Sequence, residues 1–137
     1  MKPLIILIDD DHGPMDYFVK ALEIRGFEVR HLDSIDDACV WLESAADNPP
    51  AVVIVDMMMP PGKRFTLEET VDGLRTGVLM AREVRRKLHS TPLLVLTNSN
   101  DDAIMGVLPT GTKKLAKYEI APFIFADNVK QLLDDKK

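Results

Sequence analysis

Short apolar segments that end in polar residues alternate with stretches of helical periodicity along most of the chain. The first strand is predicted at 4–8, where five apolar residues run without interruption, as expected for a strand buried on both faces of a sheet. Similar strands are predicted at 51–55 and 93–96, and alternation of apolar and charged residues predicts another at 27–31. A short edge strand is predicted at 114–116.

Between these strands, apolar residues recur at spacings of three and four, which predicts amphipathic helices. The first helix begins near Pro14 and ends before Gly26, residues suited to those two positions. Ser34, with Asp37 three residues later, resembles a capping box that opens a second helix extending to Ala45. Further helices are predicted at 77–88 and 126–133, with a short one at 101–108.

Strands that alternate with helices need crossover connections, which place the strands parallel in one sheet with helices on both faces. The order of elements therefore predicts a five-stranded, doubly wound α/β fold of the flavodoxin-like type. A length of 137 residues suits one domain, so residues 1–137 are interpreted as a single unit.

Composition narrows the classes of function. There are 22 Asp and Glu against 17 Lys and Arg, and the net charge of −5 argues against nucleic acid or an anionic membrane surface as the main partner. The longest apolar runs are far shorter than the roughly 20 residues that cross a bilayer. Cys39 has no second cysteine with which to form an internal disulfide, so we expect a cytoplasmic protein.

In such sheets the functional site lies beyond the carboxyl ends of the strands. The groups at the strand ends are Asp9, Asp10 and Asp11 after the first strand, Asp56 after the third, Thr97 after the fourth, and Lys113, Lys114 and Lys117 near the presumed fifth. Neighbouring carboxylates repel one another unless a cation joins them, and an all-oxygen ligand set favours Mg²⁺. With Mg²⁺ present, a strand-end carboxylate can act as a nucleophile toward a phosphoryl group.

The histidines do not add to this site. His12, His31 and His89 show no metal-type spacing, so each is interpreted as structural or exposed.

The residues at these strand ends carry a family resemblance. The segments IILIDDD at 5–11, VIVDMMMP at 53–60 and VLT at 95–97 resemble, in this order, the receiver domain of two-component response regulators. The resemblance covers nearly the whole chain. It implies that Asp56 is the phosphoacceptor and that Asp9 and Asp10 hold Mg²⁺. It further implies that the Met58 main-chain carbonyl is a metal ligand and that Thr97 is the switch hydroxyl.

The resemblance implies a stand-alone receiver that accepts a phosphoryl group from a sensor histidine kinase or a histidine phosphotransfer protein. Such a domain assists its own phosphorylation and dephosphorylation without being a dedicated enzyme, and its output is contact with a downstream protein. Two alternatives remain open. One is a receiver-like binding module that does not use phosphate. The other is an Mg²⁺-dependent phosphatase with an aspartate nucleophile, a class that normally has a second aspartate where Met58 stands.

The chain departs from the family in the loop at 61–76, which is longer than receivers usually have and mixes charged residues with Gly and Thr. Long loops inside small domains are usually functional or disordered. One hypothesis is that this loop overhangs Asp56 and restricts access to it, and the alternative is a floppy surface insertion.

A second departure concerns the family's Lys-Pro pair. Either Lys117 matches the lysine, with Tyr118 in place of the proline, or the match is at Ala121–Pro122 and the ammonium is missing. We favour Lys117, where the usual cis peptide is disfavoured because a non-proline cis bond costs about 3 kcal/mol.

Two side chains near the site also differ from the family pattern. Lys114 stands where receivers tend to have an aromatic residue that rotates during switching. Asn98, which follows Thr97, is larger than the usual small residue, so we expect it to narrow access to Asp56 and slow the attack of water.

Overall fold

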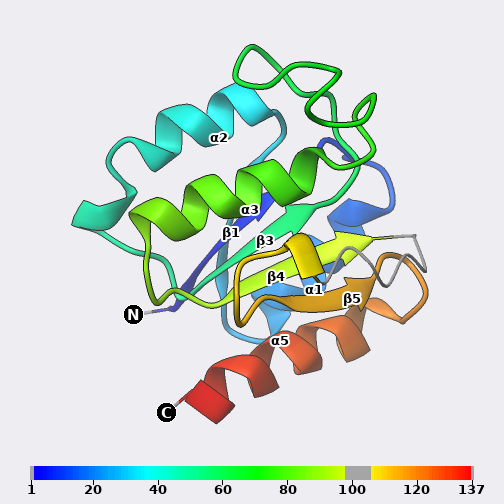
Figure 1. Ribbon diagram of the computed structural model, residues 1–137. Coiled ribbons are helices and arrows are strands. Elements are labelled where there is room, and N and C mark those ends of the chain that lie inside the picture. Colours follow the sequence, from blue (N-terminus) through cyan, green and yellow to red (C-terminus); the bar gives the residue numbers. More distant parts are fainter. Residues whose placement is uncertain (1, 98–105, 137) are drawn as a thin grey trace.

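A five-stranded parallel sheet with strand order β2-β1-β3-β4-β5 forms the centre of the chain, and helices lie on both of its faces (Figure 1). The computed structural model describes residues 2–97 and 106–136. The strands are β1 (Leu4–Ile8), β2 (Glu28–Leu32), β3 (Val52–Asp56), β4 (Leu93–Thr97) and β5 (Lys113–Ala116). The helices are α1 (Met15–Ile24), α2 (Ile35–Leu42), the 3₁₀ helix η1 (Ala45–Asp47), α3 (Thr76–Lys87) and α5 (Pro122–Lys136). The predicted doubly wound fold is confirmed.

Each face of the sheet has its own apolar core. The helices α2 and α3 contribute Trp41 and Met80 to one core, and α1 and α5 contribute Phe18 and Phe125 to the other. The residues of β3 and β4 are buried along the whole of each strand, which explains their uninterrupted apolar sequences. Burial of one such large side chain stabilises the fold by roughly 1.5–3 kcal/mol, so these two cores fix the sheet that carries the site.

The second helix shows where the sequence pattern succeeded and where it failed. The Ser34 hydroxyl accepts a hydrogen bond from the Asp37 main-chain N–H at 3.0 Å, which confirms the predicted N-cap. The helix ends at Leu42, so the prediction that it extends to Ala45 is wrong. Ala45 lies in η1 and is still buried in the same core. The spacing of apolar residues indicates which side chains are buried, and a 3₁₀ turn can bury the Ala45 side chain as well as an α-helix can.

The segment at 61–76 is folded, which contradicts its interpretation as a floppy insertion. Phe65 is buried in the core beneath α2 and α3. The Thr66 hydroxyl accepts a hydrogen bond from the Glu69 N–H, and the Glu69 carboxylate accepts one from the Thr66 N–H, both at 3.0 Å. This reciprocal pair is the arrangement of a capping box, and it orders the middle of the segment.

The same segment is anchored to both helices that border it. The Lys63 N–H donates a hydrogen bond to the Asp36 carboxylate on α2 at 2.8 Å, and Arg64 forms an ion pair with Glu83 on α3. In Figure 1 the segment lies beside the ends of α2 and α3. These contacts place it next to the two helices, and its predicted control of access to Asp56 stays a prediction.

Gly77, in the first turn of α3, permits a close approach of the helix to the end of β3. A Cβ atom at this position would lie 2.7 Å from the Met57 Cα and nearer still to the Asp56 carbonyl oxygen. We expect Gly77→Ala to lower the free energy of unfolding by about 2 kcal/mol, measured by urea denaturation, because overpacking outweighs the better helix propensity of alanine. Gly106→Ala is the control, since a Cβ there meets nothing within 4 Å. Equal stabilities of the two variants would contradict this account.

Candidate functional site

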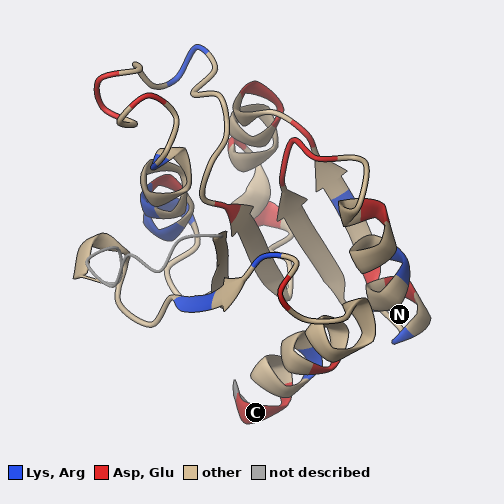
Figure 2. Ribbon diagram, turned by 90° about the vertical axis from the view of Figure 1, so that its right-hand side faces the viewer, with Lys and Arg blue, Asp and Glu red and all other residues tan. Residues whose placement is uncertain are grey.

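Three carboxylates meet at the carboxyl edge of the sheet. Asp9 directly follows β1, Asp10 comes next, and Asp56 is the last residue of β3. Because Ile8 of β1 pairs with Val55 of β3 in parallel register, the residues that follow them lie side by side. One oxygen from each of the three carboxylates can be chosen so that all lie within 4.8 Å of one another. This grouping agrees with the predicted convergence of the three carboxylates, and Figure 2 shows acidic residues in red at ends of strands of the sheet.

Lys117 completes this cluster with a positive charge. Its Nζ lies 3.0 Å from Asp9 Oδ2 and 3.2 Å from Asp56 Oδ2, so one ammonium bridges two buried carboxylates. The main chain holds it there, because the Lys117 N–H donates a hydrogen bond to the Thr97 carbonyl at 2.9 Å. Pro122, by contrast, is the first residue of α5. The Lys117 register is therefore the one in which an ammonium meets the acids.

Burial and mutual repulsion shift the ionisation of these groups. Burial, followed by the charge of Asp9, raises the pKa of Asp56 to about 7, although Lys117 opposes that rise. Burial also raises the pKa of Asp9. Burial alone would lower the pKa of Lys117, but the carboxylates of Asp9 and Asp56 outweigh it and raise that pKa. Lys117 is therefore positively charged, and its one charge is shared between the carboxylates of Asp9 and Asp56.

The residues present fit a divalent cation. When Asp9, Asp10 and Asp56 are ionised, three negative charges face the one positive charge of Lys117, which leaves an excess of two within a few ångströms. Asp10 is exposed while the other two carboxylates are buried, so the cluster opens at the protein surface. A set of carboxylate oxygens at a surface edge is the kind of donor set that Mg²⁺ takes while it keeps several waters.

The other predicted site residues have different surroundings. Thr97 is buried as the last residue of β4, on the strand next to β3. Met58 is 43% exposed, and the assignment of its main-chain carbonyl as a metal ligand stays a prediction. Lys114, at the position where receivers tend to have an aromatic residue, is half-buried on β5. Asn98, predicted to narrow access to Asp56, lies outside the described residues.

Asp11 makes hydrogen bonds outside the cluster of Asp9, Asp10 and Asp56. Its carboxylate accepts a hydrogen bond from the Gly13 N–H at 2.8 Å and another from the Tyr118 hydroxyl. The Tyr118 bond lowers the pKa of Asp11. Asp11 thus joins the loop after β1 to the segment that follows β5.

Tyr118 is the site residue whose structural role was missed by the sequence analysis. Its backbone has a positive φ of 65°, and its ring packs 5.6 Å from that of Phe18 on α1, centroid to centroid. The Lys117 Nζ lies 5.1 Å from the Tyr118 ring centroid. Tyr118 therefore borders the bridging lysine. The signal in the sequence was a tyrosine at the position where receivers usually have a proline.

His12 is exposed and His31 is half-buried, in keeping with their interpretation as structural or exposed, but the two rings are neighbours in space. The sequence spacing indicated no grouping of His12 with His31, yet their ring centroids lie 4.5 Å apart. The parallel register pairs His31 on β2 with Leu7 on β1, which brings it beside the loop that carries His12. His31 Nε2 also lies 2.7 Å from the Asp9 carbonyl oxygen. Spacing along the chain could not indicate this contact, because strand pairing creates it.

Known proteins of solved structure have the same fold. The receiver domain of the hybrid histidine kinase CckA is 22% identical, with a TM-score of 0.69 over 95% of this chain and 98% of that one. A CheY-like receiver domain protein from Methanospirillum hungatei JF-1 is 17% identical, with a TM-score of 0.75 over 99% and 97%. The BeF₃-activated DrrB receiver domain is 19% identical, with a TM-score of 0.69 over 98% and 99%.

No protein-family model and no curated protein matches the sequence. At identities below 25%, the structural likeness establishes the receiver-domain fold across nearly the whole chain. None of the helices in the described part of the chain is long and apolar enough to cross a membrane.

Proposed function

We propose that this chain is a response-regulator receiver that takes a phosphoryl group onto Asp56 in a Mg²⁺-dependent reaction. The donor would be a sensor histidine kinase or a histidine phosphotransfer protein, and the phosphorylated domain would signal by contact with a downstream protein. The observation that carries this proposal is the cluster of Asp9, Asp10 and Asp56, with Lys117 bridging two of its members. Solved receivers of the same fold, one of them part of a hybrid histidine kinase, support it.

The chemistry follows from the positions of these side chains. A carboxylate oxygen of Asp56 attacks the phosphorus of a phosphohistidine, an O–P bond forms, and the P–N bond breaks with its electron pair passing to the imidazole. Lys117, 3.2 Å from the attacking group, offers positive charge to the phosphoryl oxygens. The Thr97 hydroxyl would donate a hydrogen bond to one of those oxygens. Mg²⁺ held by Asp9, Asp10, Asp56 and the Met58 carbonyl would supply further positive charge to the transferred group.

The test uses a small donor. We expect the purified chain, incubated with Mg²⁺ and acetyl phosphate, to gain about 80 Da by intact-mass spectrometry, the mass of one phosphoryl group. Asp56→Asn should abolish the adduct because an amide is not a nucleophile toward phosphorus. Asp11→Asn is the matched control and should keep the adduct, since Asp11 lies outside the cluster. An adduct that persists in Asp56→Asn would contradict the assignment of the acceptor.

The alternatives predict different results. A binding module that does not use phosphate would acquire no adduct. A site without its lysine, together with a loop that blocks Asp56, would favour this alternative, whereas Lys117 contacts Asp56. A phosphatase would turn over phosphomonoesters, and Met58 stands where that class has its second aspartate. The mass of the adduct and the turnover of phosphomonoesters, both measured on the same purified protein, therefore distinguish the three functions.

A further inference from the structure

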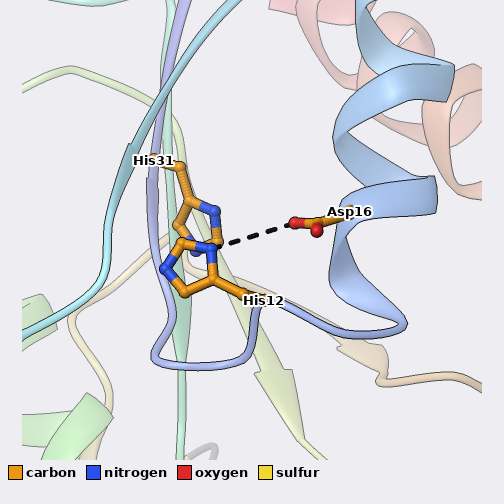
Figure 3. Close-up of side chains that lie close together, drawn as sticks. All are labelled: His12, Asp16 and His31. Carbon is orange, nitrogen blue, oxygen red and sulfur yellow. Dashed lines mark ion pairs between the residues drawn. The ribbon is translucent and has the colours of Figure 1, made fainter.

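Two histidines and an aspartate gather beside the acidic cluster (Figure 3). His12 lies in the loop after β1, Asp16 in the first turn of α1, and His31 on β2. One ligand atom from each can be chosen so that all three lie within 4.8 Å of one another. The group thus combines three separate elements, and Figure 3 shows Asp16 reaching from the helix toward the two rings.

Each imidazole already donates one N–H to an acceptor. His31 Nε2 lies 2.7 Å from the Asp9 carbonyl oxygen, and His12 Nε2 lies 3.0 Å from Asp33 Oδ2. A carbonyl and a carboxylate can only accept, so both Nε2 atoms carry hydrogen. In a neutral imidazole the other ring nitrogen, Nδ1, then holds a lone pair. His12 Nδ1 in turn lies 3.9 Å from Asp16 Oδ1.

This donor set differs from that of the acidic cluster. Two imidazole nitrogens and one carboxylate suit transition metal ions such as Zn²⁺, whereas three carboxylates suit Mg²⁺. Zn–N and Zn–O distances of about 2.0–2.1 Å place tetrahedral ligands about 3.3 Å apart. The 3.9 Å between His12 Nδ1 and Asp16 Oδ1 is about 0.6 Å longer than this tetrahedral separation. Both side chains are more than half exposed and can make that adjustment, and water would fill the fourth position.

Asp9 and Asp33 act as outer partners of this group. In protein metal sites, a histidine that binds the ion with one nitrogen commonly donates the other N–H to a carboxylate or a main-chain carbonyl, which fixes the ring and its tautomer. His12 and His31 each have such a partner here. Both rings are therefore held in the tautomer that a metal ion needs.

We propose that His12 Nδ1, His31 Nδ1 and the Asp16 carboxylate form a second metal site, which takes a divalent transition metal ion and for which Zn²⁺ is the best match. The site goes beyond the proposed receiver function and does not depend on it, because none of its three ligands belongs to the acidic cluster.

The experiment is a titration of the full chain with Zn²⁺ by isothermal calorimetry, in excess Mg²⁺ so that the acidic cluster is occupied. We expect one equivalent to bind. His12→Gln, His31→Gln and Asp16→Asn should each weaken the affinity by about tenfold or more. Co²⁺ serves as a spectroscopic probe, because a four-coordinate Co²⁺ site absorbs strongly in the visible range, and the same variants should lose that absorption.

The controls separate this site from others. His89→Gln removes an exposed histidine elsewhere on the surface and should leave the Zn²⁺ affinity unchanged. Asp16→Asn alters an exposed side chain, so it keeps the test valid even if a histidine variant fails to fold. Binding that survives Asp16→Asn and His12→Gln would overturn the proposal, as would the absence of zinc binding or a Zn²⁺ affinity that depends on Asp56 instead.

Discussion

Lys117→Met is expected to slow formation of the phosphoryl adduct by about 100-fold or more, the scale on which removal of one charge-stabilising group slows catalysis. It should also lower the free energy of unfolding at pH 8 by about 3 kcal/mol. The ammonium lies 3.0 Å from Asp9 and 3.2 Å from Asp56, and both carboxylates are buried. Methionine keeps much of the side-chain volume but leaves the two charges without their partner. Adduct formation is followed by intact mass and stability by urea denaturation.

The loss of stability should depend on pH in a defined direction. Without the lysine, the pKa values of Asp9 and Asp56 in the folded state rise further above those of the unfolded chain. A raised carboxyl pKa means that stability is fully present below the unfolded pKa and is lost as the pH rises through the folded pKa. The difference in the free energy of unfolding between Lys117→Met and wild type should therefore be smaller at pH 5 than at pH 8. Lys113→Met, at an exposed residue of β5, is the control. A difference in stability between Lys117→Met and wild type that does not change with pH would contradict its origin in the ionisation of Asp9 and Asp56.

The arrangement of the sheet could be predicted because each central strand carries its own signal. β1, β3 and β4 are surrounded by apolar neighbours, so their sequences are uninterrupted apolar runs that end in polar residues at the site. The parallel arrangement then brings Asp9 and Asp56 together without further information, since strand ends of a parallel sheet share one edge. The acidic cluster was predictable for this reason.

What the sequence left open depends on local backbone geometry and on pairing between strands. The choice between Lys117 and Ala121–Pro122 depends on where β5 ends. That end is hard to predict because β5 is a half-buried edge strand with weak alternation of apolar and polar residues. The proximity of His12 and His31 follows from the register of β2 on β1, which no spacing within either segment encodes. Apolar periodicity likewise could not tell α-helix from 3₁₀ helix at Ala45, because both bury the same side chain.

Asp56→Asn is expected to stabilise the metal-free protein at pH 8, although it removes the residue that we assign as the phosphoacceptor. The pKa of Asp56 in the folded protein is raised to about 7, chiefly by burial and by Asp9, from an ordinary value of 3.8. Ionisation of the folded protein is therefore disfavoured by about three pKa units, which corresponds to an upper limit of about 4 kcal/mol. Asparagine imitates the neutral carboxyl group, so we expect a gain of about 2–4 kcal/mol at pH 8 in urea denaturation with EDTA.

The direction of the pH dependence and the effect of Mg²⁺ on stability make this prediction specific to the acidic cluster. Because the folded pKa lies above the unfolded one, the cost of ionisation is absent below about pH 4 and complete above about pH 7, so the advantage of Asp56→Asn should disappear on acidification. Mg²⁺ should stabilise wild type more than the variant, since the ion binds the folded state and the variant lacks one ligand charge. Asp47→Asn, on an exposed aspartate of η1, should show neither effect. A wild type that is as stable as Asp56→Asn at pH 8 without metal would mean that the Asp56 carboxylate is not destabilised by its buried neighbours.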